Sequence, residues 1–131
     1  MLIGELAKIT GLSKDGVRYY EDLGLIHSKP VQAGTRIYRD YDDTTLERLA
    51  LIALGKRMHF LLRDIAAVIN RLIKDDITRE ERSVLLLAQV QQVDAQIADL
   101  EDVKKQLLHF AESPDKEVVD AHLKKVGLWY E

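Results

Sequence analysis

The chain contains 131 residues, of which 47% are hydrophobic and 31% are charged, enough for one ordinary domain with an apolar core. It has no cysteine, which excludes disulfides and thiolate metal ligands. No apolar run reaches the length of a membrane span and no signal peptide pattern opens the chain. We therefore expect a cytoplasmic protein with no membrane partner.

The net charge of −3 is unevenly distributed along the chain. Residues 1–72 contain 11 Lys and Arg against 9 Asp and Glu, whereas residues 73–131 contain 8 against 13. Because surfaces that bind nucleic acid are basic, the small positive excess favours the first half as a DNA-binding part.

Two short helices are predicted at the start of the chain. The first covers about residues 3–10, with Leu6 and Ile9 directed toward the second, and a glycine turn follows it. Ser13 is suited to cap the second helix, and Gly24 to end it in the left-handed conformation. Helical spacing gives this second helix an inward stripe of Val17, Tyr20 and Leu23.

Lys14, Arg18 and Tyr19 lie off this stripe and should point outward. A short helix that presents a guanidinium, an ammonium and a phenol is suited to a groove of DNA. An ordinary amphipathic surface helix would show the same residues, so the pattern alone leaves both interpretations open.

A two-stranded wing is predicted next. Residues 25–27 form a first short strand that Pro30 ends, and residues 36–38 form a second, with Gly34 in the connecting turn. Arg36 and Tyr38 share one face because side chains alternate along a strand. Such a pair can bond phosphates and lie along sugars.

Together these features closely resemble the N-terminal domain of MerR-family transcriptional regulators. The shared motifs are Ile3-Gly4-Glu5-Leu6-Ala7, Arg18-Tyr19-Tyr20-Glu21, Gly24-Leu25 and Gly34-x-Arg36-x-Tyr38. The resemblance covers roughly the first half of the chain and implies a winged helix-turn-helix. It indicates a DNA-binding surface made of Ser13, Lys14, Arg18, Tyr19, Tyr20, Thr35, Arg36 and Tyr38.

The sequence departs from the family pattern at three positions. Thr35 stands where relatives usually have Tyr or Asn, so one wing contact is smaller here. His59 and Leu61 stand where relatives typically have Gly and Ser. The usual serine cap of the fourth helix is therefore missing, and other groups must satisfy its first amides.

Two further helices complete the first half. Thr44 and Glu47 fit a capping box for the third, and the fourth continues to about Lys74. Apolar periodicity predicts that the third buries Leu46, Leu49, Ala50, Ile52, Ala53 and Leu54. The fourth is expected to bury Leu62, Ile65, Ala66, Val68, Ile69 and Leu72.

A helix of about 35 residues is predicted from a capping box at Thr78 to Ser113. Its apolar seam, interrupted at Lys104, recurs with a seven-residue period and consists of Leu86, Val90, Val93, Ile97, Leu100 and Leu107. No other element is long enough to cover it, which favours self-association over packing on its own domain. The resemblance implies an antiparallel coiled coil in a homodimer.

Ser113-Pro114-Asp115 should start a last helix that Gly127 ends. Its apolar stripe is Val118, Val119, His122, Leu123 and Val126. Trp129 and Tyr130 are packing anchors or part of a ligand pocket. The predicted division is a DNA-binding domain over 1–74, a dimerisation helix over 75–113 and a helical tail over 114–131.

Motifs for catalysis are absent from the sequence, so we expect a protein that is not an enzyme and has no cofactor. His109 and His122 approach each other if the last helix folds back, which leaves a metal site or ordinary histidines as alternatives. Many relatives sense metals or oxidants through cysteine, a chemistry this chain lacks.

The resulting hypothesis is a mainly helical regulator that binds double-stranded DNA at an inverted-repeat operator as a homodimer and distorts it. RNA polymerase would be an indirect partner. The alternative from another class is a module of similar fold that binds a chaperone or another protein instead of DNA.

Overall fold

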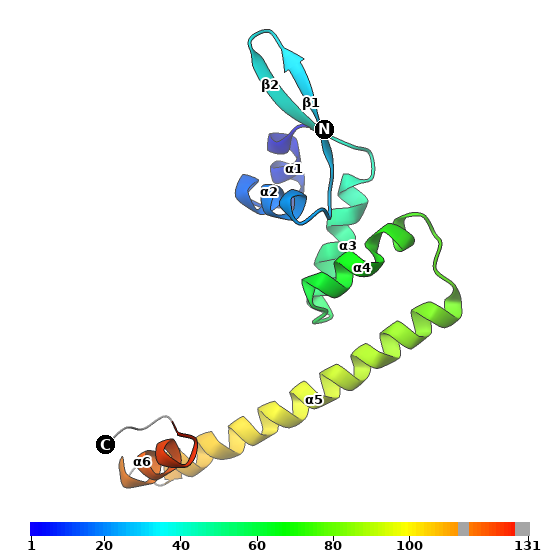
Figure 1. Ribbon diagram of the computed structural model, residues 1–131. Coiled ribbons are helices and arrows are strands. Elements are labelled where there is room, and N and C mark those ends of the chain that lie inside the picture. Colours follow the sequence, from blue (N-terminus) through cyan, green and yellow to red (C-terminus); the bar gives the residue numbers. More distant parts are fainter. Residues whose placement is uncertain (113–115, 128–131) are drawn as a thin grey trace. The chain divides into compact units, whose positions relative to one another are not determined.

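A computed structural model describes residues 1–112 and 116–127 (Figure 1). Two compact units are present, Met1–Leu85 and Leu86–Glu131. The elements in chain order are α1 (Ile3–Thr10), α2 (Lys14–Asp22), β1 (Ser28–Ala33), β2 (Arg36–Tyr41), α3 (Thr45–Arg57), α4 (Leu62–Ile73), α5 (Arg79–Glu112) and α6 (Lys116–Lys125). This order confirms the mainly helical fold with a helix-turn-helix, a wing, a long helix and a short C-terminal helix.

The ends of α1 and α2 form as the sequence predicts. The backbone N–H of Gly16 donates to the Ser13 hydroxyl oxygen at 3.0 Å, which caps α2. Gly11 ends α1 with φ of +74°, and Gly24 follows α2 with φ of +76°. Both angles lie in the left-handed region, where a glycine carries no Cβ penalty.

The packing of α1 and α2 differs from the prediction at two positions. Leu6 and Val17 are fully buried, but Ile9 is 61% exposed and Leu23 is also exposed. Two helices of eight and nine residues bury mainly the side chains near their contact. Ile9, one turn farther along, lies in an open hollow beside Leu46 on α3.

The wing is longer than predicted and starts later. β1 and β2 pair antiparallel from Ser28–Tyr41 to Ala33–Arg36, with Gly34 at φ of +64° in the turn. The strand predicted over residues 25–27 is wrong, because Leu25 and Ile26 are buried in the core between α2 and β1. Pro30 does not end β1 but pairs opposite Arg39. A two-stranded sheet has only edge strands, where proline is tolerated.

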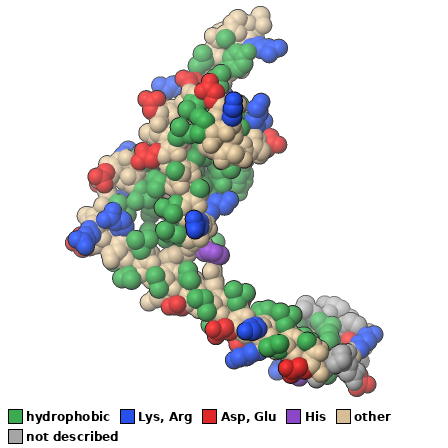
Figure 2. Space-filling model, turned by 180° about the vertical axis from the view of Figure 1, so that it is seen from behind, with side chains coloured by type: hydrophobic (Ala, Val, Ile, Leu, Met, Phe, Trp, Pro, Cys, Tyr) green, Lys and Arg blue, Asp and Glu red, His purple; other side chains and the backbone are tan. Residues whose placement is uncertain are grey.

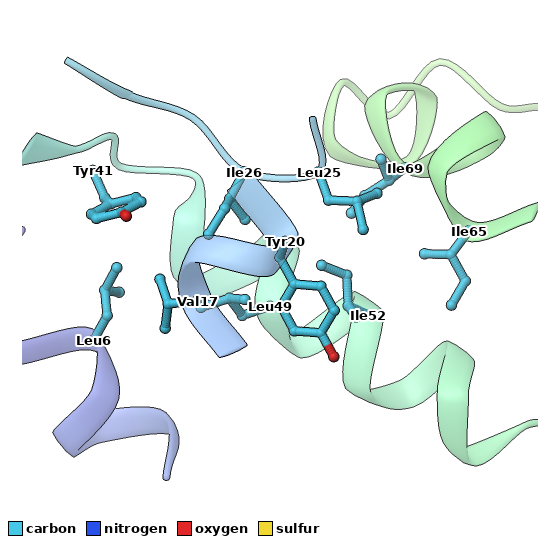
Figure 3. Close-up of a cluster of buried hydrophobic side chains, with 10 residues drawn as sticks. All are labelled: Leu6, Val17, Tyr20, Leu25, Ile26, Tyr41, Leu49, Ile52, Ile65 and Ile69. Carbon is cyan, nitrogen blue, oxygen red and sulfur yellow. The ribbon is translucent and has the colours of Figure 1, made fainter. Parts of the chain in front are cut away.

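The core lies among the four N-terminal helices and the base of the wing (Figure 3). Its buried hydrophobic residues are Leu6, Val17, Tyr20, Leu25, Ile26, Tyr41, Leu49, Ile52, Ile65 and Ile69. Several residues predicted to be in this core are exposed instead, namely Leu46, Ala50, Ala53, Leu54 and Ala66. Other elements of this unit cover only part of α3 and α4, so residues at the margins of each apolar stripe stay accessible.

The N-terminus of α3 is capped differently from the prediction. Thr44 makes no side-chain cap hydrogen bond, so the proposed capping box is wrong. Asp42 Oδ1 accepts instead from the Thr44 N–H at 3.0 Å and from the Thr44 hydroxyl at 2.7 Å. A carboxylate is a stronger acceptor than a hydroxyl and is favoured at the positive end of a helix.

The turn before α4 follows the unusual residues in the sequence. His59 has φ of +65°, a left-handed conformation in a residue that carries a Cβ. Leu61 occupies the N-cap position and, as predicted, provides no side-chain cap. The Phe60 N–H donates to the Gly55 carbonyl at 3.0 Å, so the end of α3 holds this turn.

The capping box at Thr78 forms as predicted: the Thr78 hydroxyl accepts from the Glu81 N–H at 3.1 Å, and the Glu81 carboxylate is hydrogen-bonded in turn by the backbone and hydroxyl of Thr78. The Glu81 carboxylate forms an ion pair with Arg71 at 2.5 Å. Within α5 no residue is buried, and the apolar seam is exposed or half-exposed along its length. Figure 2 shows hydrophobic side chains at the surface along this helix.

In the second unit, the Phe110 ring of α5 lies 5.5 Å from the His122 ring of α6, centroid to centroid. Gly127 follows α6 with φ of +73° and so ends it as predicted. The predicted helix start at Ser113–Asp115 and the residues Trp129 and Tyr130 lie outside the described residues.

Candidate DNA-binding surface

The outward face of α2 carries the side chains that the sequence assigned to it. Lys14, Arg18 and Tyr19 are exposed, and Tyr19 retains 55% of its accessible surface. One nitrogen of Arg18, Nη1, lies 3.3 Å from Asp15 Oδ1 one turn earlier. Both side chains are well exposed, so this surface pair is weak and leaves the guanidinium available to a phosphate or a base edge.

Tyr20 does not lie on this outward face. It is 7% exposed and packs in the core, and Lys56 donates to its hydroxyl oxygen at 3.3 Å. Tyr20 therefore holds α2 against α3. Ser13 is exposed, but its hydroxyl is engaged in the helix cap, so its part in the site is to start the recognition helix.

The wing presents its own set of exposed side chains. Thr35 lies in the hairpin turn, and Arg36 and Tyr38 follow on β2 with one residue between them. This spacing places Arg36 and Tyr38 on one face of the hairpin, as predicted. Ile37, on the other face, is also largely exposed.

A polar network at the base of the wing was not found from the sequence. The Tyr41 hydroxyl donates to Glu21 Oε2 at 2.6 Å, and the Ser28 hydroxyl donates to Glu21 Oε1. Arg39 donates from Nη1 to the Ser28 hydroxyl at 3.2 Å and lies 3.4 Å from Glu21 Oε1. The only signal in the sequence was the acidic end of the Arg-Tyr-Tyr-Glu motif.

This network shifts the acidity of its members. Partial burial raises the pKa of the Glu21 carboxyl, but hydrogen bonds from Ser28 and Tyr41 outweigh it and leave that pKa below its usual value. Burial and the bond to Glu21 raise the pKa of Tyr41 to about 12. At neutral pH the pair is therefore an ionised acceptor and a neutral donor.

The histidine pair singled out in the sequence meets around one aromatic ring. His109 and His122 lie with their rings 5.7 and 5.5 Å from that of Phe110. Over residues 1–112 and 116–127, no three His, Cys, Asp or Glu side chains form a group able to hold a metal ion. In the same ranges, no helix is both long and apolar enough to cross a membrane.

A capped recognition helix, a preceding short helix and a hairpin with exposed basic and phenolic side chains define a winged helix-turn-helix protein. Residues 1–72 match the family model described as "MerR HTH family regulatory protein", and residues 46–110 match the one described as "MerR, DNA binding". The chain belongs to the MerR family of DNA-binding transcriptional regulators and is not an enzyme.

Relatives of known name cover most of the chain. A "Probable heavy metal-dependent transcriptional regulator" of Haemophilus influenzae is 34% identical over 115 residues, spanning 86% of this chain and 87% of that protein. The solved structure of the regulator PbrR691 from Ralstonia metallidurans CH34 in complex with lead(II) has a TM-score of 0.70 at 27% identity, covering 86% of each chain.

A second solved structure is similar over almost the whole chain. HiNmlR, described as a MerR family regulator lacking the sensor domain, was crystallised bound to promoter DNA. It matches with a TM-score of 0.51 and 26% identity, covering 97% of this chain and 90% of that chain.

Proposed function

We propose that this regulator binds an inverted-repeat promoter operator as a homodimer and distorts the DNA between the half-sites. The observation that carries the proposal is the pairing of two exposed basic surfaces in one unit. Lys14 and Arg18 lie on a recognition helix, and Arg36 lies on the wing. The first pair would enter the major groove, while Arg36 would bond phosphate beside it.

The remaining contacts are assigned by exposure. Tyr19 on the helix, and Thr35 and Tyr38 on the wing, are accessible and would contact backbone or base edges from each element. Ser13 and Tyr20 would act through position, Ser13 by starting the helix and Tyr20 by holding it on α3. The promoter complex of the similar HiNmlR supports this use of the fold.

Dimerisation through α5 is the second part of the proposal. The apolar seam is uncovered in the single chain, which is costly for a helix of 34 residues in water. An antiparallel pair of α5 helices from two chains would bury both seams. Symmetry of the dimer would then demand an inverted repeat in the operator.

RNA polymerase would be affected indirectly through the shape of the distorted promoter. On this view residues 1–74 read DNA, residues 75–113 join the two protomers, and residues 114–131 form a helical tail. The division into these three parts remains a prediction.

Selection of bound duplexes from a random pool tests the proposal. The expected result is a motif with two-fold symmetry whose half-sites are spaced by about one helical turn or a multiple of it. An enriched motif with a single half-site would contradict the dimeric mode. Absence of binding to any duplex at low salt would favour the protein-binding alternative.

A further inference from the structure

The wing is attached to the helices at its base, between the N-terminal residues and α2. On one side, the Tyr41 N–H donates to the Met1 carbonyl at 2.8 Å, and the Met1 ammonium donates to the Tyr41 carbonyl at 3.0 Å and pairs with Asp40. Leu2 forms a β-bridge with Asp40. On the other side, the connection to α2 is the polar network around Glu21. The rest of the hairpin has exposed side chains on both faces.

Glu21 binds both strands at the same level. Ser28 on β1 and Tyr41 on β2 are the residue pair at the open end of the hairpin, directly opposite each other in the register. The two carboxylate oxygens of Glu21 accept one bond each, Oε1 from Ser28 and Oε2 from Tyr41. Two directional bonds from one side chain to two strands fix an orientation as well as a distance.

The polar network around Glu21 is partly buried and borders an open hollow. Tyr41 is 2% exposed and Glu21 is half-buried, so the bond between them is partly shielded from water. A hollow of about 450 Å³ lies between α2 and β2, and its lining includes Glu21 and Tyr41 themselves as well as Asp22 and Tyr38. Because this open space separates α2 from β2, a small change in the bonds of Glu21 would change the angle between the wing and α2.

We propose that Glu21 is a positioning residue that sets the angle of the wing to the recognition helix. It fixes the span between the groove contacts of Arg18 and the backbone contacts of Arg36. Holding two DNA-binding elements in their bound arrangement improves affinity because less freedom is lost on binding. This inference rests on the proposed contacts of the helix and wing with DNA.

The matched control is Asp22, the next residue of α2. Asp22 carries a carboxylate too and lines the same hollow, but it is exposed. Within the described residues it forms no hydrogen bond or ion pair with the wing. Glu21→Gln and Asp22→Asn each remove one negative charge beside the DNA-binding face. Their difference therefore isolates the connection to the wing from the general effect of charge.

The first readout is DNA affinity in a double-mutant cycle with Arg36→Ala on the selected operator. Glu21→Gln should bind about tenfold more weakly than Asp22→Asn. Arg36→Ala weakens DNA binding by some factor in the wild type. That factor should be at least about threefold smaller when Arg36→Ala is introduced into the Glu21→Gln variant. Equal affinities for the two variants, with an unchanged Arg36 factor, would overturn the inference.

The second readout measures the wing directly without DNA. The chain has no cysteine, so spin labels can be placed at Lys8→Cys on α1 and Gln32→Cys on β1, both exposed. Labelled chains are diluted into unlabelled ones so that distances within one chain dominate. Glu21→Gln and Tyr41→Phe should broaden the distance distribution, whereas Asp22→Asn should leave it unchanged.

Distributions of equal width in all variants would refute the positioning role even if Glu21→Gln lowered affinity. A broadened distribution with no loss for Arg36→Ala would keep the positioning role and refute the proposed wing contact. If Glu21→Gln fails to fold, Tyr41→Phe carries the same test, because it removes one hydroxyl and keeps the buried ring.

Discussion

Arg48 of α3 donates from Nη1 to Asn70 Oδ1 of α4 at 2.8 Å. Its Nε donates to the Thr44 hydroxyl at 3.0 Å, and Nη1 also lies 3.4 Å from the Leu25 carbonyl. The side chain is almost fully buried, with 6% of its surface exposed. One guanidinium thus joins two helices and the turn after the recognition helix, because only arginine offers several donors in a fixed plane.

We expect Arg48→Ala to lower the free energy of unfolding by about 3 kcal/mol, because it leaves the buried Leu25 carbonyl and two partly buried acceptors without their charged donor. Urea denaturation measures the loss. Arg57→Ala, on the exposed end of the same helix, is the control and should change stability by less than about 0.5 kcal/mol. Equal midpoints for the two variants would show that the Arg48 bonds add nothing net.

Charge in the apolar seam should separate the protomers. Val93→Asp together with Leu100→Asp would place carboxylates in a dry interface, and sedimentation should show a monomer. Gln91→Asp lies off the seam and is exposed, so this variant should remain dimeric. A wild-type chain that sediments as a monomer would refute the proposed dimer.

Arg18→Ala and Arg36→Ala should weaken DNA binding in different ways. Arg18→Ala should cost about 1–3 kcal/mol on the cognate operator and much less on a scrambled duplex, if the guanidinium reads bases. Arg36→Ala should weaken both equally and reduce the salt dependence, because fewer counterions are released. Affinities of both variants on both duplexes across a salt series provide the measurement.

Equal losses on the two duplexes for Arg18→Ala would mean that Arg18 only positions the helix. Sequence reading would then fall to Lys14, Tyr19 or DNA shape. No loss for either variant would contradict the proposed DNA contacts.

Glu21 should contribute to the acid sensitivity of the fold. Its pKa in the folded protein is below the ordinary value of 4.5, so the folded state favours the ionised form. This stabilisation is fully present above pH 4.5 and is lost as pH falls through the folded pKa. The stability difference between wild type and Glu21→Gln, measured by urea denaturation, should therefore shrink below pH 4.5. A difference that stays constant from pH 7 to pH 3 would contradict this reading of the network.

The backbone conformation of His59 should lower the stability of the folded protein. Its φ of +65° is unfavourable for a residue with a Cβ by about 1 kcal/mol or more. His59→Gly should therefore be more stable than His59→Ala, which removes the same imidazole but keeps the Cβ. Thermal unfolding of the two variants isolates the backbone effect. A more stable alanine variant would show that the entropy of glycine in the unfolded chain outweighs the strain.

The sequence by itself determined the local features. Ser13 caps α2, and Gly24 and Gly34 adopt positive φ, because each depends only on a residue and its immediate neighbours. The outward face of α2 with Lys14 and Arg18 also followed from helical spacing alone. These features carried the resemblance that led to the family.

Only the tertiary structure decided which apolar residues are covered. Ile9 and Leu23 fit the helical stripes but are exposed, and Leu25 and Ile26 resemble a strand but fill the core as a turn. Burial depends on which other elements pack against a residue, and periodicity does not contain that information. The bonds of Glu21 to Ser28 and Tyr41 join residues 7 and 20 positions apart, so only the folded chain brings them together.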